Sequence, residues 1–300
     1  MEEPRATKAG TASDRGWTCA TCGLHAEDNY CAHCGEKRHT DHDFSLRHVL
    51  AEAAEAFFHV DSKIFGTLKI LVTKPGELPA EFFRGRRKPY MSPLQTFFVC
   101  NLLFFVLQPL TGLEILAPGL RSYENNTGFN NLTRRLVDRR LAQKHLSRTN
   151  EAQFVEFSEK FYHNARLQAK SLILALAPMM ALALAILNFR RRRYFTEHLI
   201  LAVFTYAWWL LWLLVVLVAG ALVFVLSSLS GHQMGVKLLD WAATLLEFGG
   251  LGVYLFLASR RFYQDKIFPA FAKGVLLAFS GFGFFLLYRF LLFFTVLYST

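Results

Sequence analysis

The sequence predicts an all-α polytopic membrane protein of about five transmembrane helices that carries a small N-terminal zinc ribbon. Of the 300 residues, 53% are hydrophobic and 30 are Phe, whereas soluble domains are usually about 45–50% apolar. The long apolar runs all follow Pro93, and the segment before it is polar and charged. Four of the five cysteines form two close pairs near the N-terminus. This asymmetry indicates a soluble head followed by a membrane body.

The cysteine pairs follow the pattern C-x2-C-x8-C-x2-C, formed by Cys19, Cys22, Cys31 and Cys34. Gly23 and Gly35 follow the two pairs, where a positive φ lets backbone N–H groups approach the thiolates. Four thiolates complete the tetrahedral coordination of Zn²⁺ and leave no open position, which is typical of a structural site. Two redox C-x-x-C motifs and a rubredoxin-like iron site are the alternatives, but no βαβ pattern surrounds the motif.

The chain divides into four regions: a disordered tail over 1–16, the ribbon over 17–38, amphipathic helices with a basic flank over 44–90, and a transmembrane domain over 93–300. Phe44–Phe58 places its apolar residues on one helical face. A second short helix is expected over Asp61–Thr73, ending at Pro75-Gly76. These helices could lie in the lipid headgroup plane, but we favour packing against the membrane body.

Two basic clusters flank apolar segments: the first contains Arg84, Arg86, Arg87 and Lys88, and the second contains Arg190, Arg191, Arg192 and Arg193. Membrane proteins concentrate Lys and Arg on cytoplasmic flanks. We attribute the net charge of +10 to this rule rather than to nucleic acid binding. Anionic lipid binding at the first cluster is a further alternative.

Five spans are predicted, over residues 93–116, 172–189, 199–229, 238–258 and 271–297. The first is the weakest, because polar residues such as Gln95 and Glu114 interrupt it. The positive-inside rule then places the N-terminus in the cytoplasm and the C-terminus outside. Residues 118–170 should lie outside, despite 10 Lys and Arg against 5 Asp and Glu, unless the first span is only re-entrant. A helix over Asn150–Lys170 is expected to run directly into the second span.

Two ionisable residues fall inside predicted spans, Glu247 in the fourth and Arg289 in the fifth. Such groups are functional candidates by default. Both are eight or nine residues from the outer ends of antiparallel neighbours, so we expect an ion pair between them. The pair either locks two helices together or belongs to a proton or substrate pathway.

Certain strings in this sequence resemble a family of bacterial membrane proteins, the domain of unknown function 3667. They are Tyr30–Gly35, Thr73–Gly76, Phe83–Pro93, Tyr194–Leu199 and Val253–Tyr263. The resemblance implies a zinc-ribbon protein of the bacterial cytoplasmic membrane and implies no activity. Members often carry Gln at the position of Glu36, a conservative difference.

No nucleophile–base pair, H-E-x-x-H motif, P-loop or dinucleotide fingerprint occurs in the sequence. An intramembrane enzyme is therefore unsupported. We favour a non-enzymatic scaffold whose ribbon docks a protein partner, with the lipid bilayer as its surroundings. The alternative is a small transporter or channel subunit that uses Glu247 and Arg289. The sequence gives no oligomeric state.

Overall fold

The protein is built almost entirely from helices, several of them longer than 20 residues. A computed structural model describes residues 16–38, 63–112, 115–126, 130–191, 193–229 and 236–300. In this part of the chain, five helical segments are long and apolar enough to cross a membrane: Pro93–Thr111, Glu151–Leu187, Phe195–Ser227, Trp241–Phe262 and Ile267–Ser299. The predicted fold class is confirmed: the chain is an all-α multi-pass membrane protein, and its long helices contact the lipid bilayer.

The N-terminal ribbon contains two short strands, β1 (Trp17–Thr18) and β2 (His25–Ala26). They pair antiparallel, with Trp17 opposite Ala26. A second hairpin repeats this arrangement through a bridge between Tyr30 and Lys37. Each hairpin holds one C-x-x-C pair at its turn, so the local sequence repeat becomes a structural repeat.

Two short helices connect the ribbon side of the chain to the bundle: α2 (Lys63–Thr73) and α3 (Glu77–Phe83). As predicted, α2 stops before Pro75-Gly76. Gly76 has φ of +79°, and a Cβ there would lie 2.8 Å from the Cα of Ala258. The turn therefore needs glycine both for its backbone conformation and for its contact with the bundle. The predicted helix over Phe44–Phe58 lies outside the described residues.

The first span consists of α4 (Pro93–Leu107) and the 3₁₀ turn η2 (Gln108–Thr111). Ser92 and Gln95 form a reciprocal capping box at its start. The prediction that this span extends to residue 116 was wrong. Pro109 and a left-handed Gly112 end the helix at Thr111, because proline lacks a backbone donor and glycine permits the reversal.

The second span is part of one long helical run made of α7 (Glu151–Leu172), η3 (Ile173–Ala175) and α8 (Leu176–Leu187). The Asn150 side chain caps its start by accepting a hydrogen bond from the backbone N–H of Gln153. The expectation that the preceding helix continues into the span is confirmed. A short turn, η4 (Phe189–Arg191), follows α8.

Three more long helices complete the bundle: α9 (Phe195–Leu229), α10 (Val236–Phe262) and α11 (Ile267–Ser299). An aromatic ladder joins α9 to α10, with the Trp208 ring stacked 4.3 Å from Tyr254 and 5.7 Å from Trp212. The Trp212 indole donates a hydrogen bond to the carbonyl of Leu246, over the space that Gly250 leaves free. The tryptophans of α9 thus pack helices together.

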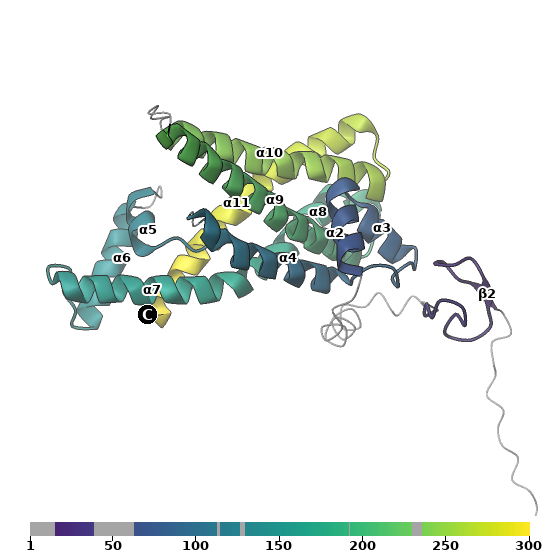
Figure 1. Cartoon of the computed structure of the whole chain (residues 1–300), viewed down its shortest axis with the longest axis horizontal. Coiled ribbons are helices and arrows are strands. Elements are labelled where there is room, and N and C mark those ends of the chain that lie inside the picture. Colours follow the sequence, from purple (N-terminus) through teal and green to yellow (C-terminus); the bar gives the residue numbers. More distant parts are fainter. Residues whose placement is uncertain (1–15, 39–62, 113–114, 127–129, 192, 230–235) are drawn as a thin grey trace, which may run out of the picture.

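Figure 1 shows that the two ends of the bundle carry different elements. The ribbon, α2 and α3 lie at one end, where α10 turns into α11. The other end carries α5 (Leu120–Asn126), α6 (Asn130–Gln143) and α7. There Arg148 binds the buried Glu124 at 2.7 Å and Asp138 at 2.9 Å, and the Tyr288 hydroxyl of α11 donates to the carbonyl of Leu116.

Candidate functional site

The four cysteines of the ribbon converge on one point. The Sγ atoms of Cys19 and Cys34 are 3.4 Å apart, those of Cys22 and Cys31 are 3.6 Å apart, and all four lie within 4.8 Å of one another. Thiolates about 2.3 Å from a shared metal ion would be separated by comparable distances. The cluster can therefore hold a tetrahedral metal ion, and its four protein ligands leave no position for a substrate.

Backbone hydrogen bonds shape both halves of the cluster in the same way. Gly23 donates to the carbonyl of Cys19 at 2.9 Å, and Gly35 donates to that of Cys31 at 2.7 Å. Both glycines have positive φ, +76° and +69°, as their positions in the sequence predicted. Hydrogen bonds from the backbone N–H groups of Cys34 and His33 lower the pKa of the Cys31 thiol to about 6, whereas burial and hydrogen bonds with the neighbouring thiols raise the pKa of Cys22 and of Cys34. The backbone donors therefore favour a thiolate at Cys31.

Glu36 attaches the ribbon to the bundle. It is only 4% exposed. Its Oε2 accepts hydrogen bonds from the Thr21 hydroxyl at 2.6 Å and from the backbone N–H of Lys88 at 3.0 Å. One carboxylate oxygen thus joins the first hairpin of the ribbon to the basic segment that precedes α4.

The basic segment before α4 is held by acids of α3. Glu81, which is buried, binds Arg84 at 2.6 Å and Arg86 at 2.9 Å, and the first of these contacts raises the pKa of Arg84. Arg87 donates to the carbonyl of Phe82 and lies 4.0 Å over that ring. The predicted basic flank is therefore folded onto α3.

A second charged network closes the same end of the bundle. Asp265, in the turn between α10 and α11, is 7% exposed and binds Arg191 and Lys273, the latter at 2.7 Å. Lys273 also donates to the Asn188 side chain at 2.6 Å. Arg191 additionally donates to the backbone carbonyl of Tyr263. One buried carboxylate therefore connects the ends of α8, α10 and α11.

The other members of the four-arginine run have separate surroundings. Arg193 pairs with Glu197 and lies 4.9 Å over the Phe262 ring. Arg190 is exposed and lies 5.6 Å over Phe189. Arg192 lies outside the described residues.

His198 and Tyr263 form a buried polar contact at this end, with 2.6 Å between the His198 Nδ1 and the Tyr263 hydroxyl. His198 is 2% exposed, so it is a residue of the interface between α9 and the end of α10. Nearby, Arg261 binds Glu77 at 3.2 Å and donates to the carbonyl of Pro75 at 3.0 Å. The strings Thr73–Gly76, Tyr194–Leu199 and Val253–Tyr263 thus meet in space.

The expected ion pair between Glu247 and Arg289 is not formed. The ion pairs within 4.0 Å among the described residues include neither side chain, and the Glu247 Oε1 and the Arg289 Nε lack hydrogen-bond partners there. The Arg289 guanidinium lies 5.5 Å over the ring of Tyr123 instead.

The register of α10 against α11 explains why that expectation failed. Phe248 contacts Phe282 and Phe285, so Glu247 lies opposite residues 281–285 rather than 289. Arg289 is therefore displaced toward the end of the bundle that carries α5. Equal distances from the outer helix ends did not give equal depth, because α11 has 33 residues and α10 has 27, so α11 continues past the outer end of α10.

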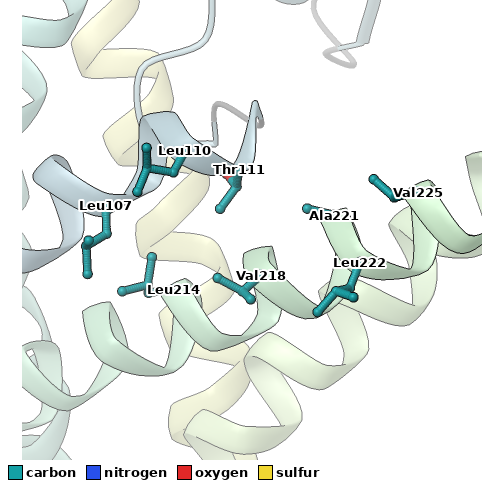
Figure 2. A pocket seen from close by; sticks show the side chains of 8 residues that line it. All are labelled: Leu107, Leu110, Thr111, Leu214, Val218, Ala221, Leu222 and Val225. Atoms are coloured by element: carbon teal, nitrogen blue, oxygen red, sulfur yellow. The ribbon is translucent and has the colours of Figure 1, made fainter.

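Two hollows on the bundle surface are apolar. One, of about 430 Å³, lies between the end of the first span and the second half of α9. Figure 2 shows Leu107, Leu110 and Thr111 on one side and Leu214, Val218, Ala221, Leu222 and Val225 on the other. The second, of about 680 Å³, runs between α10 and α11. Neither is lined by Glu247 or Arg289.

The sequence predicted the four clustered cysteines and the basic residues. It did not reveal the buried acidic residues that bind these basic residues or connect the ribbon to the bundle. Glu36, Glu81 and Asp265 are buried and join elements far apart in the chain. A usable signal was present for Asp265, the one acidic residue among Arg260, Arg261 and Lys266. For Glu36, the only signal in the sequence was its position directly after the second C-x-x-C-G motif.

Comparison with known proteins gives one partial family match and no activity. The family described as "Protein of unknown function (DUF3667)" matches residues 61–105, which span α2, α3, the basic segment and most of α4. This match supports similarity to a family of unknown function over that part of the chain. No curated protein matches the chain. No solved structure matches it either.

Proposed function

We propose that this protein is a non-enzymatic membrane scaffold whose ribbon, held by a structural zinc ion, presents a docking surface for a protein partner. The observation that carries the proposal is the position of Glu36. By binding both Thr21 and the backbone of Lys88, it holds the ribbon in a defined orientation on the bundle. A site closed by four cysteines has no open coordination position for catalysis. The metal therefore serves to hold the ribbon in its folded shape.

The topology we propose places the ribbon in the cytoplasm of a bacterium, at its inner membrane, and the C-terminus outside. Arg84, Arg86, Arg191, Arg193 and Arg261 all gather at the end of the bundle that carries α2 and α3. Basic residues in short loops favour the cytoplasmic side, and they count more in this rule than the 10 Lys and Arg of the long segment 118–170 at the other end. Zinc is the metal that fits, because four thiolates in a reducing compartment suit it best.

The ribbon offers two exposed apolar side chains for contact, Leu24 at 49% and Tyr30 at 61% exposure. Aromatic side chains of this kind anchor protein interfaces. A photo-reactive amino acid at either position should cross-link one defined protein in intact cells. The same label in a Cys22→Ser background should lose that product, because the unfolded ribbon no longer presents the surface. A cross-link unaffected by Cys22→Ser, or no product at all, would overturn the proposal.

A flux assay on reconstituted vesicles separates the scaffold from the transporter alternative, which the buried Glu247 favours. The scaffold predicts ion and solute fluxes equal to those of empty vesicles. A flux that the purified protein supports and that Glu247→Gln abolishes would establish transport instead.

A further inference from the structure

The larger apolar hollow is a groove between α10 and α11 on the outside of the bundle. Its lining is apolar and combines small residues, Gly249, Gly252 and Ala278, with large ones that include Trp241, Phe256 and Phe279. Several lining residues are highly exposed, including Phe279 at 74%. An exposed apolar groove on a membrane helix pair faces the lipid hydrocarbon.

The length of the groove fits a lipid chain. From Trp241 to Leu257 it follows α10 for about 24 Å at 1.5 Å per residue. The hydrocarbon of one leaflet is about 15 Å thick, half of the full core. The half of the groove nearest α3, from Phe248 to Leu257, is about 14 Å long and therefore has room for an acyl chain of one leaflet.

Positive charge stands at that same end. Arg260 is exposed and lies 6.0 Å over the Phe256 ring, which lines the groove. Lys266 is exposed at the start of α11. The ion pairs among the described residues involve neither side chain, whereas Arg261 and Lys273 beside them are both paired with acids. Arg260 thus leaves an uncompensated cation beside the end of the hydrocarbon groove, and Lys266 adds a second in the turn between α10 and α11 at the same end.

We propose that the α10–α11 groove binds one anionic phospholipid, with an acyl chain along Gly249 and Gly252 and the headgroup phosphate at Arg260 and Lys266. The charge complementarity selects this occupant over a second copy of the chain, which would leave both cations without a counter-charge. Each basic residue near an anionic headgroup contributes on the order of a fivefold gain in affinity. The site does not depend on the ribbon or on the proposed scaffold function.

The structure offers a matched pair of variants for the apolar half of the site. A Cβ at Gly249 meets nothing within 4 Å, so Gly249→Leu fills the groove without a clash. A Cβ at Gly283 on α11 also meets nothing within 4 Å, but Gly283 does not line the groove. Gly283→Leu is therefore the control for adding a leucine to a membrane helix.

The charged half has its own matched pair. The double variant Arg260→Gln with Lys266→Gln removes the cations at the groove. Arg190→Gln removes an exposed arginine of the same end of the bundle that contacts only Phe189 among the described residues. Arg260 and Lys266 lie at the end of the groove, whereas Arg190 does not line it. Comparing the two variants therefore distinguishes lipid binding at this site from a general attraction of the positively charged end for anionic lipid.

The test is titration of the full-length protein, in zwitterionic phosphatidylcholine nanodiscs, with phosphatidylglycerol, followed by native mass spectrometry of retained lipid. The wild type should retain one phosphatidylglycerol per chain. Gly249→Leu should weaken retention about tenfold and the double Gln variant roughly 20–30-fold, whereas Gly283→Leu and Arg190→Gln should match the wild type. Equal losses in a variant and its control, or equal retention of phosphatidylcholine, would overturn the proposal.

Discussion

The ribbon and the bundle differ in what they bury. In the ribbon, the buried apolar cluster consists of Cys19, Ala26 and Cys31. In the bundle, one continuous cluster extends from Leu71 on α2 to Leu297 on α11. A segment of about 20 residues cannot form a core that offsets its conformational entropy, so in the function proposed above the folding free energy of the ribbon comes from a metal bound to the four cysteines. The bundle needs no metal, since its backbone bonds are internal to helices and its surface is matched to lipid.

The ribbon and the bundle also differ in where their buried charged side chains lie. The ribbon has one buried carboxylate, Glu36, and it connects outward to Lys88. The bundle concentrates its buried charges at its ends, with Asp265 at one end and Glu124 at the other. Charges at the ends of a membrane bundle can be paired and partly hydrated, whereas charges at its centre are costly. Removing each kind of interaction should therefore affect one region and spare the other.

The largest effect is expected from removal of one metal ligand. Cys22→Ser should lower the metal content of the purified protein from about one ion per chain to nearly none, because three remaining thiolates leave an open, weaker site. Metal analysis of the protein in detergent measures this. The fifth cysteine gives the control, since Cys100 is fully buried in α4, and Cys100→Ser should keep the metal. Full metal content in Cys22→Ser would refute the ligand assignment.

The next largest effect concerns the charged end of the bundle. Asp265→Asn leaves Arg191 and Lys273 without their shared counter-charge and should destabilise the protein by about 2–3 kcal/mol. Glu156→Gln breaks an exposed pair with Lys160 and should cost much less, because solvent and salt screen an exposed ion pair. Thermal unfolding of both variants in detergent compares them. Similar losses of stability in the two variants would show that burial does not determine how much an ion pair contributes to stability.

A smaller effect, confined to orientation, is expected at the junction of the two regions. Glu36→Ala removes the acceptor shared by Thr21 and Lys88, so the ribbon should keep its metal but lose its fixed position. Spin labels at Leu24 and on α2 at Phe65, both exposed, should report a broader distance distribution. Glu36→Gln retains an acceptor oxygen and should preserve the narrow distribution. An unchanged distance distribution in Glu36→Ala would show that Glu36 does not fix the orientation of the ribbon on the bundle.

The smallest effect is expected in the middle of the bundle. Because no ion pair joins Glu247 to Arg289 among the described residues, Glu247→Gln should change stability by less than about 1 kcal/mol. Loss of one partner of a true buried pair costs about 3–5 kcal/mol. A destabilisation in that higher range on thermal unfolding would restore the pair that the sequence predicted.

The elements that the sequence predicted well are those that depend on local chemistry. Cysteine spacing predicted the cluster of four cysteines that can hold a metal ion, and apolar length predicted five helices that can cross a membrane. The Pro75-Gly76 turn followed from backbone restrictions alone. The pairing of Glu247 with Arg289 failed because the depths were counted from the outer helix ends, whereas the turn between α10 and α11 sets their register. Asp265 and Glu36 were missed because each binds a group on another element, Arg191 and Lys88, which lie 74 and 52 residues away in the chain.

Hydrogen exchange with and without a metal chelator tests the division between the two regions most directly. Stripping the metal from the full-length protein in nanodiscs should abolish amide protection over residues 17–38, including the Gly23 and Gly35 amides that bond within the knuckles. Protection of α4, α9, α10 and α11 should stay the same. Persistent protection of the metal-free ribbon, or loss of protection in those helices, would contradict the account.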